Sequence, residues 1–328
     1  MGYKYTNKHD VSFALAVFLM YDDYEYDDRP NSISATGLLK PLRQIVLGQQ
    51  NKELLKTVDI SDLVASRMGS AIHTGCEEAW TDRTNVMKAL KIMGASDDAM
   101  ASIVINPKEL KPGQIPVYVE QRTEKKILDM IVSGKFDLVL DGTLNDYKST
   151  SVWGYIFDSN ADKHTKQGSI YRWLNPDKIT SDYININFIF TDWSSVKALQ
   201  DPSRYPQLRV LTRKYPLWSI PETENWIANK LEAYKALADA PQDALPECTK
   251  EELWSSETTY KYYKNPQSMK RSTKNFTDKN EAIERKANDG GGGIVITMEG
   301  EVKACRYCPV VGICNQAEQL LASGRLTL

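Results

Sequence analysis

The chain has 328 residues, of which 41% are hydrophobic and 26% charged, and its formal net charge is −2. This composition is typical of a globular protein with one large or two modest domains, and the near-neutral charge argues against a general nucleic-acid coat. The longest apolar run, Phe13 to Met20, is too short to span a bilayer and lacks the flanks of a secretory signal. We therefore expect a cytoplasmic protein with no membrane partner.

Hydrophobic periodicity predicts alternating helices and strands. The first expected elements are a helix capped by Ser34 or Thr36 that continues through Leu42 to Val46, and a helix from Ser61 to Trp80. A strand in IPVYVEQRT, a hairpin and a helix in KQGSIYRWL follow. The last ones are strands in YININFIF and QLRVLTRKY, and a long helix that begins with the capping box Ser219–Glu222. On the second helix, apolar residues recur every four positions, from Val64 and Met68 to Trp80, and form a stripe.

The stretch DLVLDGTLNDYKSTS, residues 137–151, predicts a β-hairpin that carries charge. Its Asp-Gly dipeptide suits the two central positions of a type I′ turn, which need φ > 0. Centring the turn there places Asp137 opposite Asp146, and puts Lys148 on the same face as Asp146. The two carboxylates can hold Mg²⁺ or Mn²⁺ for phosphodiester hydrolysis, and the lysine can orient the attacking water or stabilise the charge of the transition state. The alternative is a solvated hairpin with a surface Asp–Lys pair.

Five further polar residues are candidates for the same site. His73 and Glu77, one turn apart on the second helix, could complete a metal shell, or they form an ordinary polar helix edge. Glu120 ends the VYVE strand and is a further candidate carboxylate. Gln167 and Tyr171 are spaced i, i+4, which suits contact with a phosphate or a base, although such a pair also occurs in purely structural roles.

The motifs GSAIH, GKFDLVLDGTLNDYKSTS and QGSIY occur in this order, and together they resemble the RecB-like branch of the PD-(D/E)XK nuclease superfamily. The chain looks like the phage-encoded exonucleases of that branch over nearly its whole length. The resemblance implies a restriction-endonuclease-like α/β core, with a mixed β-sheet flanked by helices. It also implies a catalytic set of His73, Asp137, Asp146 and Lys148, of which the first three hold Mg²⁺ or Mn²⁺, with Gln167 and Tyr171 beside the DNA.

Cys305, Cys308 and Cys314 form a C-x-x-C-x5-C motif near the C-terminus. Such a cluster needs a fourth ligand, and its spacing suits either structural zinc or an iron–sulfur cluster. In the resembled nucleases, this motif and one distant cysteine hold a [4Fe-4S] cluster. Cys248 and Cys76 compete for the fourth place: many of the resembled nucleases take this ligand from before the catalytic core, where Cys76 lies. Cys76 is also on the apolar stripe of its helix, where a free cysteine behaves as a small hydrophobe, and the ECTKEELW context favours Cys248.

The segment between Cys248 and the cysteine triplet is basic and aromatic. Residues 261–279 contain six basic side chains and one acidic one. Lys261, Tyr262 and Tyr263 suit single-strand binding through phosphate contacts and base stacking, and a solvated hairpin is the alternative. The glycine run at residues 290–293 predicts a flexible turn and not a phosphate loop, because no Lys-Ser/Thr follows it.

These inferences predict an N-terminal helical region (1–60), a nuclease core (61–245) and a C-terminal cysteine-cluster region packing on the core (246–328). The expected function is metal-dependent exonucleolytic hydrolysis of DNA ends or single strands in recombination or DNA processing. DNA and a single-strand annealing or recombination protein are the expected partners, in the host cytoplasm if the chain is phage-encoded. The alternatives are a structure-specific or nicking endonuclease, and a non-catalytic DNA-end-binding module, which would not need opposed carboxylates.

Overall fold

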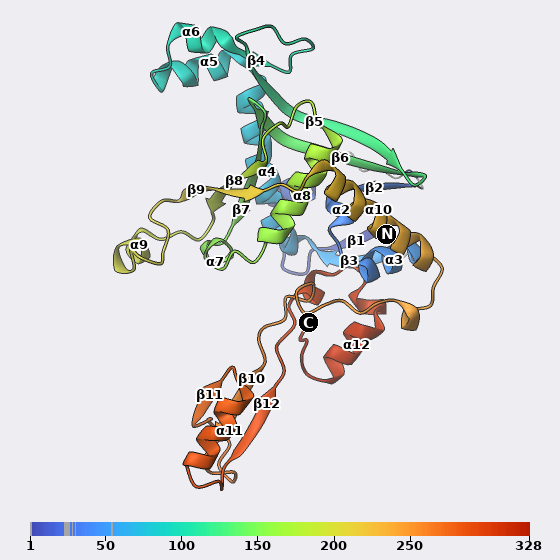
Figure 1. Cartoon of the computed structure of the whole chain (residues 1–328), viewed down its shortest axis with the longest axis vertical. Helices are drawn as coiled ribbons and strands as arrows, with labels where there is room; N and C mark the ends of the chain where they lie inside the picture. Colours follow the sequence, from blue (N-terminus) through green and yellow to red (C-terminus); the bar gives the residue numbers. More distant parts are fainter. Residues whose placement is uncertain (1, 23–26, 28, 30, 54) are drawn as a thin grey trace. The chain divides into compact units, whose positions relative to one another are not determined.

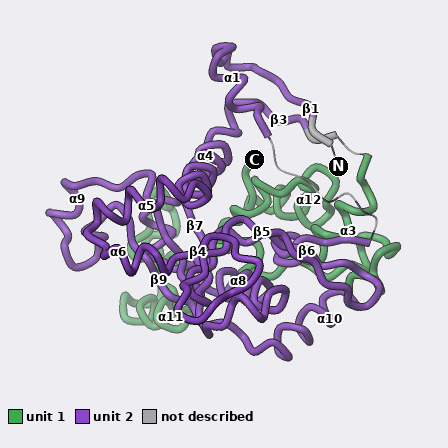
Figure 2. The backbone as a smooth tube through the Cα atoms, turned by 90° about the horizontal axis from the view of Figure 1, so that it is seen from above, with its two compact units in different colours: residues 1–2, 41–54, 234–328 green, residues 3–40, 55–233 purple. Residues whose placement is uncertain are grey.

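The computed structural model describes residues 2–22, 27, 29, 31–53 and 55–328, which form two compact units, drawn in different colours in Figure 2. One unit consists of Tyr3–Lys40 and Leu55–Ala233, and we call it the sheet unit. The other is formed mainly by Pro41–Leu54 and Tyr234–Leu328, and we call it the cysteine unit. In the described part of the chain, the helices are all too short or too polar to cross a membrane.

The sheet unit is built on a mixed seven-stranded sheet (Figure 1). Its strands lie in the order β4 (Ile103–Ile105), β5 (Ile115–Ile127), β6 (Met130–Leu140), β7 (Thr143–Thr150), β8 (Tyr183–Phe190) and β9 (Val210–Pro216), and β2 (Ser32–Ser34) pairs with the first part of β6. The β5–β6, β6–β7 and β8–β9 pairs are antiparallel, whereas β4–β5, β7–β8 and β2–β6 are parallel. The predicted mixed α/β class is confirmed.

Helices of the sheet unit connect and flank these strands. They are α1 (Phe13–Met20), α2 (Ala35–Leu38), α4 (Val64–Thr81), α5 (Arg83–Ile92), α6 (Asp97–Ser102), α7 (Val152–Ile156), α8 (Ala161–Leu174), α9 (Ser195–Gln200) and the larger part of α10 (Ile220–Leu237). A separate two-stranded sheet pairs β1 (Gly2–Thr6) with β3 (Leu55–Asp59). The helices predicted in KQGSIYRWL and after Ser219, and the strands predicted in YININFIF and QLRVLTRKY, are confirmed.

The first predicted helix is wrong, because Pro41 divides it. Ser34 caps α2 by accepting the Gly37 N–H at 3.0 Å, as expected, but α2 ends at Leu38. A second helix, α3 (Leu42–Gln50), begins after Pro41, which is extended at φ −53° and ψ 140°. Proline disfavours the helical conformation of the residue before it and lacks an N–H, so a continuous helix cannot pass this point.

Helix α4 was predicted correctly, but only the C-terminal end of its apolar stripe packs on a core, where Trp80 contacts the cluster of Val117, Val119 and Leu138. The helix is preceded by a 3-10 turn at Ile60–Leu63, and it contains no fully buried residue. Val64 and Met68 are 42% and 45% exposed. Recurrence every four residues drifts around a helix of 3.6 residues per turn, so such a stripe does not stay on one face.

The hairpin has the predicted register. Asp141 and Gly142 have φ of 46° and 76°, as a type I′ turn needs, and Leu140 faces Thr143 while Val139 faces Leu144. The β6–β7 ladder ends at Leu138 and Asn145, and beyond that point β7 follows β8 as a parallel neighbour through Thr150. The strands bearing Asp137 and Asp146 therefore part at the position of these two carboxylates.

Two glycines let α8 lie close to the sheet. A Cβ at Gly168 would come within 2.7 Å of Leu217 and 3.0 Å of Ile184 on β8. A Cβ at Gly134 on β6 would come within 2.9 Å of the Tyr171 ring. Because larger residues at either position would push the helix away, these glycines set the depth at which Gln167 and Tyr171 sit over the sheet.

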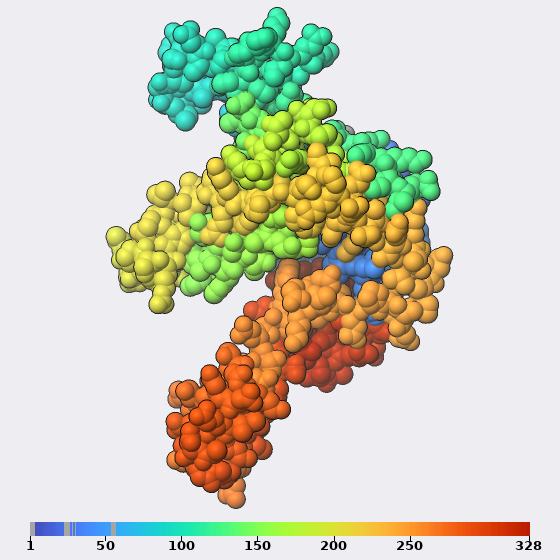
Figure 3. Space-filling model, viewed as in Figure 1, coloured from blue at the N-terminus to red at the C-terminus, as the bar shows by residue number. Residues whose placement is uncertain are grey.

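The cysteine unit contains helix α3, the end of α10 and the C-terminal part of the chain. Its remaining elements are β10 (Thr259–Tyr263), β11 (Lys274–Phe276), α11 (Lys279–Asn288), β12 (Ile294–Met298) and α12 (Asn315–Ala322), with 3-10 turns at Gln242–Ala244, Ala304–Tyr307 and Val311–Ile313. Strand β10 is central in the three-stranded sheet β11-β10-β12, and Figure 3 shows these strands and α11 as one contiguous orange mass. The glycine run forms a turn after α11, as predicted, with φ of 90° at Gly290 and 78° at Gly291.

Candidate active site

A cleft of about 890 Å³ in the sheet unit gathers polar residues from α4, α8 and the central strands. Every sequence-predicted residue of the hairpin and of its neighbouring elements lines it: His73, Glu77, Glu120, Asp137, Asp146, Lys148, Gln167 and Tyr171. Helix α4 approaches β7 closely here, because a Cβ at Gly69 would lie 3.3 Å from the Ser149 hydroxyl. The cleft is thus formed where strands β6 and β7 part.

Asp137 and His73 form the first pair of the cleft. The Nδ1 of His73 lies 3.3 Å from Oδ2 of Asp137, and the same oxygen accepts the backbone N–H of Tyr147 at 2.9 Å. The hydrogen bond with Asp137 outweighs burial and raises the pKa of His73 above its ordinary value. Burial alone would raise the pKa of Asp137, but His73 and the charge of Lys148 outweigh it, so this pKa lies below its usual range.

Asp146 is the most buried carboxylate of the cleft, with 1% of the residue exposed. Its Oδ2 lies 2.6 Å from the Lys148 Nζ but has no partner in hydrogen-bond geometry, and its Oδ1 accepts from Nε2 of Gln167 at 3.1 Å. Burial, reinforced by the charge of Asp137, raises the pKa of Asp146 to about 6 although Lys148 opposes the shift. A carboxylate held this way at neutral pH favours a cation beside it.

Lys148 and the α8 residues complete that side of the cleft. Burial would lower the pKa of Lys148, but the charges of Asp146 and Asp137 outweigh it and raise the pKa above the ordinary value. Lys148 is therefore an ammonium at neutral pH. The Nε2 of Gln167 also lies 3.3 Å from the Tyr171 hydroxyl, so the i, i+4 pair forms one polar line next to Asp146.

Glu120 reaches the cleft through an unusual backbone conformation. Its φ is +50°, and it lies between the pairs Val119–Leu138 and Gln121–Phe136, at the register position opposite Asp137. A non-glycine residue in this region is strained, and such residues cluster at functional sites. Burial raises the pKa of Glu120, with the charges of Asp137 and Glu77 adding to the effect and an ion pair with Lys135 partly offsetting it.

His73, Glu120 and Asp137 together offer a metal-binding group. Their ligand atoms lie within 4.8 Å of one another, and among the described residues no other three side chains of histidine, cysteine, aspartate or glutamate do so. Two carboxylates and an imidazole suit Mn²⁺ or Mg²⁺. Asp146, expected as a ligand with His73 and Asp137, instead contacts Lys148 and Gln167 in this structure.

Two cationic residues of the cleft were not foreseen. Arg122 and Lys135 line it from β5 and β6, where they are direct cross-strand partners. The signal was present in the strand alternation, since Lys135 is two residues from Asp137 and must share its face. The pairing of β5 with β6, which brings Arg122 in, is visible only in the fold.

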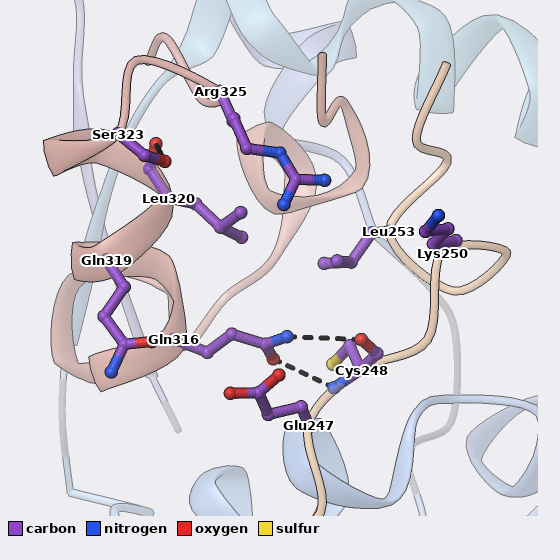
Figure 4. Close-up of a pocket in the computed structure, with 9 residues that line it drawn as sticks. All are labelled: Glu247, Cys248, Lys250, Leu253, Gln316, Gln319, Leu320, Ser323 and Arg325. Atoms are coloured by element: carbon purple, nitrogen blue, oxygen red, sulfur yellow. Dashed lines mark hydrogen bonds between the residues drawn. The ribbon is translucent and has the colours of Figure 1, made fainter. Parts of the chain in front are cut away.

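The four cysteines expected to hold a cluster all belong to the cysteine unit, whereas Cys76 is on α4 of the sheet unit. Gln316 fixes Cys248, because its Oε1 accepts the Cys248 N–H at 2.9 Å and its Nε2 donates to the Cys248 carbonyl at 3.2 Å (Figure 4). Burial raises the pKa of Cys248 to about 12, with Glu252 and the other three cysteines adding to the shift. No three of these sulfurs come within 4.8 Å of one another in the part of the chain that the structure describes.

Arg43 is buried beside this cysteine group. The residue is 3% exposed, and its Nε donates to the Sγ of Cys314 at 3.3 Å. It also donates to the Leu245 carbonyl at 3.1 Å and to the Asn315 side chain. A buried guanidinium is costly without a negative partner, and a thiolate cluster would supply that charge.

The stacking role expected for Tyr262 and Tyr263 conflicts with their burial. Tyr262 is 0% and Tyr263 is 9% exposed, and Tyr262 packs with Phe276 and Ala282 between the small sheet and α11. Rings in such positions cannot stack on bases while the sheet is folded. Lys261 is partly exposed and keeps a side chain that can contact phosphate.

No family model and no curated protein matches the chain. Among solved structures, it is similar to the crystal structure of SSO0001, with 16% identity over 67% of this chain and 81% of that chain at a TM-score of 0.34. It is also similar to a phage related exonuclease from Haemophilus somnus 129PT, with 11% identity over 69% of this chain and 95% of that chain at a TM-score of 0.35. Similarity at this level carries no argument about fold or activity, which must come from the cleft itself.

Proposed function

We propose that the chain is a metal-dependent nuclease with a restriction-endonuclease-like core, and that it is an exonuclease acting on DNA ends or single strands. The observation that carries this proposal is the meeting of Asp137, Asp146 and Lys148 in one cleft. A solvated hairpin with a surface ion pair would not bury Asp146 or raise its pKa to about 6. A module that only binds DNA ends has no use for such a carboxylate, which would repel phosphate.

The residues of the cleft fit a divalent cation. His73, Glu120 and Asp137 would hold it, and Asp146 is the candidate for a further ligand, because it is a buried carboxylate that lines the same cleft and its Oδ2 contacts only the Lys148 ammonium among the described ion pairs. A bound Mg²⁺ or Mn²⁺ would lower the pKa of a water molecule and stabilise charge on the phosphate. Oxygen ligands with one imidazole favour these ions over zinc.

The chain's own side chains would orient the reacting groups. Lys148, charged at neutral pH, can stabilise negative charge on a phosphate oxygen or orient the attacking water. Gln167 holds Asp146 through Oδ1 and so fixes the direction of its other oxygen. The Tyr171 hydroxyl lies next to Gln167, and both residues line the cleft although each is only 5% exposed.

For the cysteine unit, we propose a [4Fe-4S] cluster held by Cys248, Cys305, Cys308 and Cys314. Zinc bonds of about 2.3 Å in tetrahedral geometry bring sulfurs to about 3.8 Å from one another. Structural zinc held by the same four thiolates is the alternative. The buried Arg43 beside Cys314 supports a group with negative charge.

The proposed setting is DNA recombination or processing, with a single-strand annealing or recombination protein as a partner. This part rests on the resemblance of the motifs to phage-encoded enzymes. Lys261 on β10 is proposed as an additional phosphate contact.

The test uses end-labelled linear DNA and covalently closed circular DNA, each with Mg²⁺, Mn²⁺ or EDTA. We expect linear DNA and single-stranded tails to be degraded with either metal, and closed circles to persist. The matched control is Asp177→Asn, which removes an exposed carboxylate outside the cleft and should keep full activity, whereas Asp146→Asn should lose it. Rapid linearisation of closed duplex would establish an endonuclease instead, and no cleavage with either metal would refute the proposal.

A further inference from the structure

The floor of the cleft carries two successive cross-strand pairs of opposite charge. On β6, Lys135 and Asp137 are two residues apart and share a face. On β5, Arg122 is the direct partner of Lys135, and Glu120 occupies the register position opposite Asp137. An acidic pair is thus followed by a basic pair along the same two strands, and all four side chains line the cleft.

The basic pair is not explained by the proposed hydrolysis. Directly opposed residues on antiparallel strands have Cβ atoms about 5 Å apart, and like charges so placed destabilise a sheet. Lys135 is offset by its ion pair with Glu120. Arg122 is an exposed residue that lines the cleft, so an anion can approach it from solvent.

The distance between the two pairs matches nucleic acid. Two residues along a β-strand correspond to about 6.8 Å. Charges on one strand of a stacked nucleic acid repeat about every 3.4 Å along its axis, and farther apart when the strand is extended. A strand with one phosphate at the acidic, metal-binding pair therefore has another phosphate near the basic pair, two repeats away along a stacked strand or one repeat away along an extended one.

We propose that Arg122 and Lys135 form a phosphate subsite, which holds a phosphate of the substrate strand close to the one that is cleaved. This inference rests on the proposed function. The guanidinium of Arg122 can grip two phosphate oxygens at once, and Lys135 adds a point charge. The shared chemistry is a phosphate, which is either an internal phosphodiester or the phosphate at a strand end, and we assign the internal one.

In this subsite, Lys135 can pair with either of two anions, the Glu120 carboxylate or the phosphate. Without substrate, its ammonium pairs with Glu120. A cation bound by His73, Glu120 and Asp137 would compete with Lys135 for Glu120. The Lys135 ammonium could then pair with the phosphate instead. Binding of the metal and binding of the DNA strand would therefore favour each other.

Binding of a single-stranded oligonucleotide, measured by fluorescence anisotropy in EDTA, tests the subsite without cleavage. Arg122→Gln should weaken binding about tenfold and make the slope of log K against log salt shallower by about 0.7. Arg122→Lys should recover part of the affinity. The matched control is Lys126→Gln, which removes an exposed cation of the same strand outside the cleft and should change neither quantity.

Hydroxyl-ended oligonucleotides and those phosphorylated at the 5′ or 3′ end distinguish the source of the phosphate. An Arg122 effect on all of them supports an internal phosphodiester. An effect only on a phosphorylated end overturns that assignment in favour of a terminal phosphate. Equal behaviour of Arg122→Gln and Lys126→Gln on every oligonucleotide, or no binding by the wild-type chain, overturns the subsite altogether.

The two proposals can fail separately. If the wild-type chain cleaves no DNA with Mg²⁺ or Mn²⁺ but Arg122→Gln still loses binding, the catalytic proposal fails and the subsite stands. If cleavage is normal and the Arg122 variant binds as the control does, only the subsite fails. Unchanged circular dichroism and unfolding midpoint of Arg122→Gln would show that its fold is intact.

Discussion

Oδ2 of Asp137 accepts the backbone N–H of Tyr147 at 2.9 Å, beyond the point where the ladder between β6 and β7 ends. The carboxylate takes the place of a strand carbonyl as the acceptor for that N–H. The same oxygen lies 3.3 Å from His73. Asp137 therefore ties the two strands together at the position where they separate, in addition to its proposed metal contact.

This double role predicts different results for two substitutions. Asp137→Asn keeps an oxygen that can accept the Tyr147 N–H but loses the charge, so Mn²⁺ affinity measured by calorimetry should fall by tenfold or more, and stability should fall by the lost attraction to His73 and Lys148. Asp137→Ala also removes the acceptor, and should lower the free energy of unfolding by about a further 1 kcal/mol. Equal stability of the two variants in urea unfolding would contradict the structural role.

Asp146→Asn should abolish cleavage and stabilise the metal-free protein at neutral pH. Because the pKa of Asp146 is raised from 3.8 to about 6, ionising this side chain costs more in the folded state than in the unfolded state. The gain should be up to about 3 kcal/mol above pH 6, shrink between pH 6 and pH 4, and vanish below that range. Urea unfolding in EDTA at pH 4 and pH 7.5 measures it, and a variant less stable at pH 7.5 would contradict the assignment.

The His73–Asp137 pair should stabilise the metal-free fold in a limited pH range. The pKa of His73 is raised, so its contribution is complete below its unfolded value of about 6.5 and is lost as pH rises through the folded value. The pKa of Asp137 is lowered, so the other half of the pair is lost only in acid. In EDTA, His73→Gln should cost about 1 kcal/mol at pH 5.5 and less at pH 8.5. An equal loss at both values would show that the charge of His73 does not contribute.

Anaerobically purified protein should be brown, with a broad absorbance in the visible range. Cys248→Ala and Cys305→Ala should remove the colour, and Cys76→Ala should keep it. Arg43→Gln should retain the iron but lower the reduction potential, because a cation and a hydrogen bond near Cys314 favour the more negative, reduced state. A colourless protein with stoichiometric zinc would refute the iron–sulfur proposal, and colour lost only with Cys76 would refute the choice of Cys248.

Most of the cleft could be predicted from the sequence because its determinants are local. The Asp-Gly turn fixes the hairpin register, and i, i+4 spacing places Gln167 beside Tyr171 on one helix face. These features depend on residues close in the chain. Arg122 was not foreseen, because its position follows from the pairing of β5 with β6 and from a φ of +50° at Glu120. The presence of a glutamate does not predict a left-handed backbone conformation with positive φ.

The errors have a common physical cause, which is that residue type does not tell which side of an element is covered. Tyr262 and Tyr263 resemble exposed stacking rings in a basic segment, but α11 packs on their sheet and buries them. Val64 and Met68 resemble a core stripe, but they are exposed. The break at Pro41 was readable, since proline was present in the middle of the expected helix.

The two ends of the segment 257–300 lie next to each other in space, because the residues that flank it are paired. The Ser256 N–H donates to the Glu301 carbonyl at 3.0 Å, and the Glu301 N–H donates to the Ser256 hydroxyl at 2.9 Å. At Gly300 even a Cβ would collide with the Ser256 backbone. Because its ends are paired, this segment is an insertion whose length or sequence can change while Cys248 and Cys305 keep their separation in space. The energetic cost of such a change is small, since loop-closure entropy varies only slowly with loop length.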